Sequence, residues 1–169
     1  KLTRNSKGEA VDLGFVGEVE KVNVELINTL SGLGYIPVIA PIAVDNEGQC
    51  YNVNADQVAS EVAVALQAEK LMTLTNVPGV KGTDENGEEV VFPVLVETEV
   101  EELIAKGTIS GGMIPKVRSA LETVRRGVGR THILDGTIPH ALLLEIFTHS
   151  GIGTMIMQKR RPYHPGERI

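Results

Sequence analysis

Polar side chains recur at every second position where an expected strand passes into an expected helix. Asn52, Asn54 and Asp56 stand two residues apart in this stretch. Asn54 is a typical helix-capping residue, and a carboxylate such as Asp56 complements the helix dipole when it lies in the first turn. The same amides and carboxylate are also groups that bind ligands at a strand end. Capping and ligand binding both stay open on this spacing.

A pair of glycines before another expected helix has the composition of a phosphate-binding loop. The segment reads Ser-Gly-Gly-Met-Ile-Pro-Lys over residues 110–116. Gly111 and Gly112 allow the backbone to approach an anion, the free N–H groups of a helix start point at it, and Lys116 adds a positive charge. Neither GxxxxGK[ST] nor GxGxxG occurs in the chain, so a tight turn with a solvated lysine is the alternative.

A third strand end carries a hydroxyl and an amide. Thr75 and Asn76 close an expected strand and precede a Val-Pro-Gly turn. These side chains either contact the nucleoside of a nucleotide or simply form the turn. Open α/β sheets bind ligands beyond the carboxyl ends of their strands, where all three segments are expected to lie.

Other catalytic constellations are missing from the sequence. The four histidines, at positions 132, 140, 149 and 164, do not have the spacing of a zinc site, so no metal held by protein side chains is expected. Cys50 lies on an expected strand with no obvious base nearby, which favours a buried, inert thiol over a nucleophile. The GxSxG elbow of serine hydrolases does not occur.

The composition describes one ordinary globular domain. With 169 residues, of which 42% are hydrophobic and 22% charged, the chain is long enough to bury a sizeable core. A net charge of −6, no Trp, three Phe and three Tyr argue against binding of nucleic acid. No apolar run reaches the roughly 20 residues of a membrane-spanning helix. A single cysteine indicates a reducing compartment, which favours a cytoplasmic protein.

Strands and helices are expected to alternate along the chain. The expected strands are a hairpin within residues 1–22, a buried strand at 35–44, and strands at 49–53, 71–75, 131–134 and 153–157. The expected helices follow Asn23 as far as Gly32, follow Asn54 as far as Ala68, follow Thr98 as far as Lys106, and cover 113–126 and 139–147. Residues 81–89 are expected to form an exposed hairpin or loop. This order predicts an α/β fold with a mostly parallel, doubly wound sheet and helices on both faces. We expect one domain over residues 1–157 and a polar tail over 158–169.

Five motifs, taken together, resemble those of the N-acetylglutamate kinase branch of the amino acid kinase family. They are GFVGEV at 14–19, GYIPVIAPIA at 34–43, NVNADQVA at 52–59, SGGMIPKV at 110–117 and LLLEIFTHSGIGTMI at 142–156. The resemblance runs from Lys1 to about Ile156. It implies the amino acid kinase fold and ATP-dependent phosphorylation of the γ-carboxylate of N-acetyl-L-glutamate, the second step of arginine biosynthesis, in the cytoplasm or a plastid.

The resemblance also implies roles for individual residues. Asp56 resembles the carboxylate that organises the site, and Lys116 resembles the lysine that neutralises the transferring phosphoryl group. Asn52 and Asn54 resemble substrate contacts. Thr75, Asn76, Gly111, Gly112 and Met113 correspond to nucleotide contacts, with Asn76 standing where the family usually has Asp. Mg²⁺ is expected to be held through the phosphates of ATP.

Family members also have an N-terminal lobe that does not match any part of this chain. The resemblance therefore implies that the sequence is the nucleotide-binding C-terminal part of a kinase and is inactive alone. In arginine-inhibited members the effector is held near positions matching His132, Glu145 and Gly151, although Glu145 could equally be a solvated helix residue. The resemblance further implies that the complete protein is a homo-oligomer. Some members of the family bind the PII signalling protein, so PII is a candidate partner. A related kinase for another carboxylate, or a non-catalytic module that binds nucleotide or arginine, are the alternatives.

Overall fold

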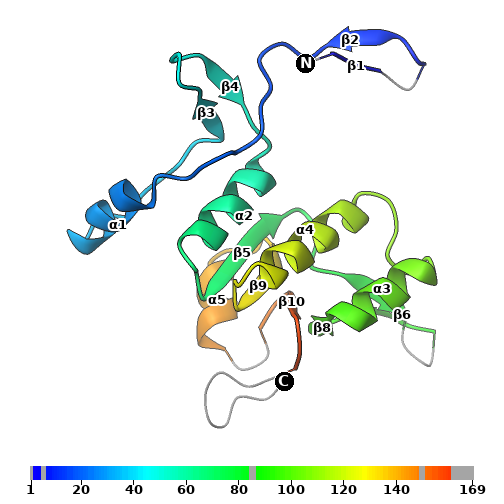
Figure 1. Cartoon of the computed structure of the whole chain (residues 1–169). Coiled ribbons are helices and arrows are strands. Elements are labelled where there is room, and N and C mark those ends of the chain that lie inside the picture. The colour runs from blue at the N-terminus through cyan, green and yellow to red at the C-terminus, as the bar shows by residue number, and fades with distance from the viewer. Residues whose placement is uncertain (1, 5–6, 84–86, 149–150, 161–169) are drawn as a thin grey trace. The chain divides into compact units, whose positions relative to one another are not determined.

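The computed structural model describes all residues except 1, 5–6, 84–86, 149–150 and 161–169. The chain divides into two compact units, a first unit of residues 1–66 and a second unit of residues 67–169 (Figure 1). Each unit is described by itself. Most of the predicted polar tail lies outside the described residues, so its separation from residues 1–157 stays a prediction.

The first unit contains two antiparallel hairpins. β1 (Leu2–Arg4) pairs with β2 (Ala10–Asp12), as the turn composition predicts. β3 (Ile42–Val44) pairs with β4 (Cys50–Asn52) across a turn that Asp45 organises. One carboxylate oxygen of Asp45 accepts hydrogen bonds at 2.9 Å from the N–H groups of Glu47 and Gln49, and the other accepts one from the hydroxyl of Tyr51 at 3.0 Å.

Both helices of the first unit begin at the predicted asparagines. α1 (Val24–Gly32) follows Asn23, whose side chain accepts a hydrogen bond from the N–H of Leu26 at 3.2 Å. α2 (Ala55–Ala65) follows Asn54. α2 ends before the predicted Ala68, because Gln67 adopts a left-handed backbone with φ of 50°. Ala63 is the buried alanine of this helix.

The predicted buried strand over 35–44 is wrong in both extent and burial. Only Ile42–Val44 is a strand, and the side chains of Ile36 and Val38 are 89% and 94% exposed. Pro37 and Pro41 lack the N–H groups that a central strand needs. No described residue of the first unit covers these apolar side chains.

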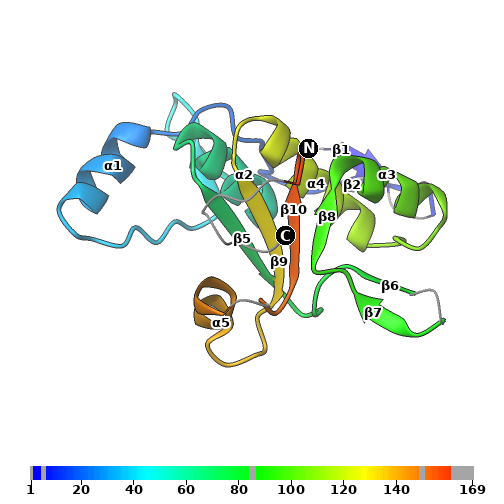
Figure 2. The same ribbon diagram turned by 90° about the horizontal axis from the view of Figure 1, so that it is seen from below.

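The second unit is built on a four-stranded sheet with the order β5-β9-β10-β8 (Figure 2). These strands span Lys70–Thr75, Arg130–Asp135, Thr154–Met157 and Val94–Val96. β5 is parallel to β9, β10 is antiparallel to β9, and β8 is parallel to β10. The mostly parallel sheet is confirmed, whereas β8 has no counterpart in the predicted strands. β6 (Lys81–Thr83) and β7 (Glu89–Val91) form the expected hairpin.

Helices cover both faces of this sheet. Neighbouring side chains of β9 point to opposite faces, so they contact different helices. Thr131 and Ile133 face α4 (Met113–Arg125), and the hydroxyl of Thr131 donates to the carbonyl of Ala120 at 3.5 Å. His132 faces α5 (Ala141–Phe147) on the other side, where its Nδ1 atom lies 2.7 Å from Glu145. The predicted doubly wound arrangement is therefore confirmed in the second unit.

The core lies between the sheet and the pair of helices α3 (Glu97–Ala105) and α4. The buried cluster there consists of Val80, Leu95, Val100, Ile109, Val117, Ala120, Leu121, Ile133 and Ile156. Val117, Ala120, Leu121 and Val124 of α4 are buried as the helical periodicity predicts. None of the described helices combines the length and apolar character needed to cross a membrane.

The predicted starts of two helices need correction. α3 starts after Val96 rather than after Thr98, because the Glu99 carboxylate accepts a hydrogen bond from the Val96 N–H at 2.9 Å and so caps the helix from within its first turn. α5 starts at Ala141 rather than Pro139, since His140 has a left-handed backbone with φ of 61°.

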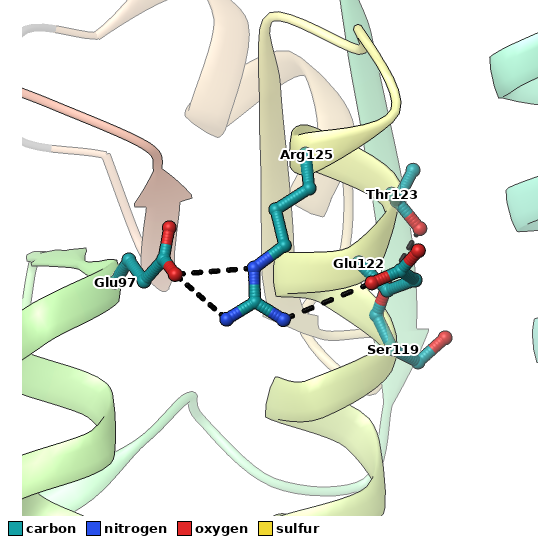
Figure 3. A network of polar contacts seen from close by, with 5 residues as sticks. All are labelled: Glu97, Ser119, Glu122, Thr123 and Arg125. Carbon is teal, nitrogen blue, oxygen red and sulfur yellow. Dashed lines mark hydrogen bonds and ion pairs between the residues drawn. The ribbon is translucent and has the colours of Figure 1, made fainter.

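An ion pair joins the start of α3 to the end of α4 (Figure 3). Two guanidinium nitrogens of Arg125 donate to one carboxylate oxygen of Glu97 at 2.7 and 3.1 Å, and a third nitrogen lies 3.7 Å from Glu122. α3 and α4 form a helical hairpin, and this contact closes its open end. The connecting loop at the other end carries the two adjacent glycines.

Removing a core side chain should destabilise the second unit far more than removing an exposed one. Leu121 is 1% exposed, so we expect Leu121→Ala to cost about 2 to 5 kcal/mol, because the cavity cannot collapse completely. Leu143, on α5, is 54% exposed, and Leu143→Ala should change stability by no more than about 0.5 kcal/mol. Amide hydrogen exchange of β9 in increasing urea would measure both changes. Equal effects of the two variants would contradict this description of the core.

Candidate functional site

The carboxyl ends of β5 and β9 meet at one edge of the sheet. Thr75 is the register partner of Asp135, and the N–H of Gly136 donates to the carbonyl of Thr75 at 2.8 Å. The Thr75 hydroxyl accepts a hydrogen bond from the N–H of Val77 at 3.0 Å, so this side chain forms the turn. Asn76 is exposed at the same edge. Both predicted nucleoside contacts therefore stand where parallel strands commonly bind ligands.

The glycine loop lies at this same edge because α4 runs antiparallel to β9. Ala120, near the middle of the helix, contacts Thr131 near the start of the strand, and the helix returns to β9 through only residues 126–129. The start of α4 therefore points toward the carboxyl end of β9. The structure thus brings the loop of residues 110–116 to the edge that carries Thr75 and Asn76.

The backbone of the glycine loop is open. Gly111 has φ of +55°, and a Cβ added at Gly111 or Gly112 would meet nothing within 4 Å. The N–H groups of Met113 and Ile114 donate to the carbonyls of Ser110 and Gly111 at 3.2 and 3.3 Å. Within the described part of the chain, the N–H groups of Gly111 and Gly112 donate to no acceptor.

This arrangement fits a polyphosphate. Two N–H donors, the positive end of the α4 dipole and the half-buried Lys116 in the first turn all favour an anion. The space around the two glycines admits close approach of a ligand to the backbone. Of the two alternatives for this loop, the geometry favours anion binding over a simple tight turn.

The remaining catalytic and substrate candidates belong to the first unit. Asn54 caps α2, and its side-chain oxygen accepts a hydrogen bond from the N–H of Gln57 at 3.1 Å. Asp56 lies in the first turn of the helix, and Asn52 is exposed at the end of β4. The capping interpretation is thus confirmed for Asn54. The cooperation of Asp56 with Lys116, which belongs to the other unit, stays a prediction.

The three residues that the resemblance implicates in effector binding come together on the α5 side of the sheet. The Nδ1–H of His132 donates to Glu145 at 2.7 Å, and these side chains are only 6% and 7% exposed. The N–H of Ile152 donates to the other carboxylate oxygen, also at 2.7 Å. Gly151 has φ of +59°, and a Cβ added there would lie 2.8 Å from that oxygen. The interpretation of Glu145 as a solvated helix residue is therefore wrong.

The environment of Glu145 favours the charged carboxylate. Burial raises the pKa of Glu145, but the hydrogen bonds from His132 and from the backbone N–H of Ile152 outweigh burial and leave the pKa below its ordinary value. The Nε2 atom of His132 is also buried and has no hydrogen-bond partner among the residues that the structure describes. A polar atom of a bound ligand or a water would satisfy it.

Two groups that belong to these sites, the carboxylate of Asp135 and the N–H of Ile152, were missed in the sequence analysis. Asp135 stands at the ligand-binding edge, where hydrogen bonds from the hydroxyl and the N–H of Thr137, at 2.7 and 2.9 Å, lower its pKa. An Asp-Gly-Thr sequence after a strand end is the signal that could have indicated it. The N–H of Ile152 leaves no such signal, since every residue except proline carries one.

The thiol prediction is wrong about burial. Cys50 is free and exposed at the start of β4. The described residues contain no group of three or more His, Cys, Asp or Glu side chains placed to hold a metal ion.

The second unit is thus an α/β domain with a mostly parallel sheet, helices on both faces and an open glycine loop before α4. The sequence profile of the amino acid kinase family matches residues 2–135, and the chain belongs to this family. It is 51% identical to an acetylglutamate kinase of Carboxydothermus hydrogenoformans over 92% of this chain and 54% of that protein. It is 55% identical to an acetylglutamate kinase of Chromohalobacter salexigens over 88% of this chain and 47% of that protein. The chain spans about half the length of these curated relatives.

Solved structures with similar folds agree with this assignment. N-acetylglutamate synthase from Neisseria gonorrhoeae, complexed with coenzyme A and L-arginine, superposes with a TM-score of 0.78 and 29% identity, over 92% of this chain and 36% of that one. Carbamate kinase from Giardia lamblia bound to AMP-PNP superposes with a TM-score of 0.63 over 94% of this chain and 52% of that one. At 22% identity, the carbamate kinase supports the fold alone.

Removing the charge of Glu145 should destabilise the second unit in a pH-dependent way. Because the folded pKa of Glu145 is depressed, its charged form stabilises the fold above the ordinary carboxyl pKa, and this stabilisation is lost as pH falls through the folded value. We expect Glu145→Gln to cost about 1 to 3 kcal/mol at pH 7, and less below about pH 4. Urea unfolding between pH 3 and pH 7 would measure this. Glu122→Gln, at an exposed glutamate, is the control, and a penalty for Glu145→Gln that does not change with pH would contradict the assignment.

Proposed function

We propose that the complete protein to which these residues belong phosphorylates the γ-carboxylate of N-acetyl-L-glutamate with ATP, the second step of arginine biosynthesis. The observation that carries this proposal is the open glycine loop at the edge of the parallel strands, in a chain more than half identical to acetylglutamate kinases. We place the reaction in the cytoplasm, or in a plastid if the source is a photosynthetic eukaryote.

The second unit supplies the groups that would hold ATP. The N–H groups of Gly111 and Gly112 donate to phosphate oxygens, Met113 brings backbone against the nucleotide, and Lys116 offsets the charge of the transferring phosphoryl group. Thr75 and Asn76 contact the nucleoside from the adjoining strand end. Mg²⁺, held through the phosphates, would neutralise further charge on the oxygens of the transferred group.

The acceptor carboxylate is already a nucleophile, so the reaction does not need a general base. Catalysis then depends on positioning and on charge stabilisation in the transition state. In this proposal Asn52 and Asn54 contact the acetylated amino acid, and Asp56 orients cationic groups. The side-chain oxygen of Asn54 is already engaged at the start of α2, which leaves its amide nitrogen for the substrate.

Because the chain covers about half of each curated relative, we propose that the 169 residues bind nucleotide without turnover. A panel of acyl acceptors, tested on the complete protein, would separate N-acetyl-L-glutamate from the other carboxylates or carbamates that sister kinases use. Calorimetry of this chain with MgATP would detect the binding module.

Replacing Lys116 should slow phosphoryl transfer without unfolding the protein. In the complete protein we expect Lys116→Ala to lower kcat by about 10²- to 10³-fold, because an electrostatic contact to the transferring group is lost. Lys106→Ala is the matched control, since Lys106 is an exposed lysine whose side chain pairs only loosely with Glu102, at 3.7 Å. A coupled assay of ADP release measures both variants. Turnover of Lys116→Ala within a few-fold of the parent would refute the role of Lys116.

We also propose that arginine binds on the α5 side of the sheet and inhibits the complete enzyme. A carboxylate matches a guanidinium well, and Glu145 is held ready by His132 and Ile152. The Neisseria synthase with which this chain superposes was solved with L-arginine, which supports the idea. A homo-oligomer, and binding of the PII signalling protein, belong to the same proposal of a regulated enzyme.

Crowding the Glu145 carboxylate should weaken this arginine site. We expect Gly151→Ala to raise the Kd for arginine at least about tenfold, which corresponds to 1.4 kcal/mol, because the new Cβ would meet the carboxylate oxygen at 2.8 Å. Gly107→Ala has a similar left-handed backbone, with φ of +75°, but open space around its Cβ, so it controls for backbone strain. Calorimetric titration with arginine would decide. Unchanged arginine affinity in Gly151→Ala would refute this site and leave the kinase proposal standing.

A further inference from the structure

Asn52, at the end of β4, depends on its backbone for its position. It is exposed, and its side chain makes no hydrogen bond within the part of the chain that the structure describes. The N–H of Asn52 donates to the carbonyl of Phe15 at 2.8 Å, and the carbonyl of Asn52 accepts a hydrogen bond from the N–H of Gly17 at 3.0 Å. On its other edge Asn52 is the register partner of Ile42 in β3. The segments on either side of β4 therefore decide where the Asn52 amide lies.

The side chains of β4 alternate between two faces. Asn52 shares a face with Val16, its partner in a parallel bridge, whereas Tyr51 points to the opposite face. There the ring of Tyr51 meets the ring of Phe15 edge to face, with the centroids 6.0 Å apart and an interplanar angle of 77°. The two aromatic rings thus fix the face of the strand that does not carry Asn52.

Gly17 leaves the space that Tyr51 occupies. A Cβ added at Gly17 would lie 3.1 Å from the Cβ and 3.4 Å from the Cγ of Tyr51, a spacing tighter than most Cβ contacts in proteins. The two segments would have to separate by a few tenths of an ångström to admit it. Because the N–H of Gly17 also donates to the carbonyl of Asn52, such a shift would reach Asn52 directly.

The other end of the Tyr51 ring is held by Asp45. The hydroxyl of Tyr51 donates to one carboxylate oxygen of Asp45 at 3.0 Å, and the other oxygen accepts two N–H groups of the turn between β3 and β4. The ring is therefore held by the turn, by Phe15 and by the surface of Gly17. Its position in turn fixes the register of β4 against residues 15–17.

We propose that Tyr51, packed against Gly17, is a positioning residue that sets the place of the Asn52 amide for the acceptor substrate. The inference rests on the proposed function, in which Asn52 contacts the acetylated amino acid. Hydrogen bonds from an amide are directional, so a small displacement of Asn52 weakens its hold on that substrate. Tyr51 points away from the face of Asn52 and acts through it.

The first test is a comparison of two Michaelis constants in the complete protein. We expect Tyr51→Ala to raise the KM for N-acetyl-L-glutamate at least about tenfold and to leave the KM for MgATP within about twofold, because the groups that would hold ATP belong to the second unit. Tyr51→Phe loses only the hydroxyl and keeps the ring against Gly17, so its acceptor KM should stay within about threefold of the parent. A general loss of folded enzyme would lower kcat and change neither KM.

The decisive test repeats Tyr51→Ala in a protein that already carries Asn52→Ala. We expect Asn52→Ala alone to raise the acceptor KM at least about tenfold. If Tyr51 acts through Asn52, adding Tyr51→Ala should then change that KM by less than about twofold, because the effects of residues that work as a unit do not add.

A glycine pair tests the close contact with Tyr51. Gly17→Ala should raise the acceptor KM at least about fivefold, since the new Cβ forces the two segments apart. Gly32→Ala is the matched control, because it adds the same methyl group in the first unit, at the end of α1, where a Cβ would meet no described atom within 4 Å. Its acceptor KM should stay within about twofold of the parent.

Several results would overturn the inference. An effect of Tyr51→Ala that persists in the Asn52→Ala protein would show that Tyr51 does not act through Asn52. An unchanged acceptor KM in Tyr51→Ala or in Gly17→Ala would exclude the positioning role, as would equal increases in the two Michaelis constants. In each of these cases the parent is active and the kinase proposal stands. A parent protein that does not phosphorylate N-acetyl-L-glutamate would refute the proposed function, and this inference with it.

Discussion

The parallel pairing of β5 with β9 is the constraint on which the candidate nucleotide site depends. It brings two carboxyl strand ends to one edge, and the antiparallel return of α4 brings the glycine loop to the same edge. The buried contact between the helix and the sheet fixes the direction of α4. The N–H groups of Gly111 and Gly112 are therefore positioned by the packing of α4 against the core.

On the α5 side of the sheet a different constraint applies, because a buried charge such as that of Glu145 needs hydrogen-bond partners. Glu145 would be costly to bury alone, and the imidazole of His132 and the N–H of Ile152 offset that cost. The two faces thus hold two kinds of site. One is an open backbone cradle with an excess of positive partial charge, and the other is an enclosed carboxylate, each of whose oxygens accepts one hydrogen bond.

Much of this organisation could be predicted from local sequence signals. Asn23 and Asn54 cap their helices, and the spacing of Val117, Leu121 and Val124 predicts the buried face of α4. These signals depend only on neighbours along the chain. The start of α3 could not be placed in this way, because Glu99 outcompetes Thr98 through a contact to the backbone of Val96. The prediction that residues 35–44 are buried was wrong for another reason. A hydrophobic pattern shows which side chains a segment can bury, but it does not show whether a partner is present to cover them.

Side chains of β9 contact helices on both faces of the sheet, and this limits the sequence changes that the strand can tolerate. Thr131 and Ile133 face the hydrophobic core under α4, while His132 faces α5 and contacts Glu145. A one-residue shift in the register of β9 would exchange the side chains on its two faces and would place the His132 imidazole in the hydrophobic core under α4. Insertions and deletions within residues 130–135 should therefore be lost in evolution far more often than point substitutions at the same positions.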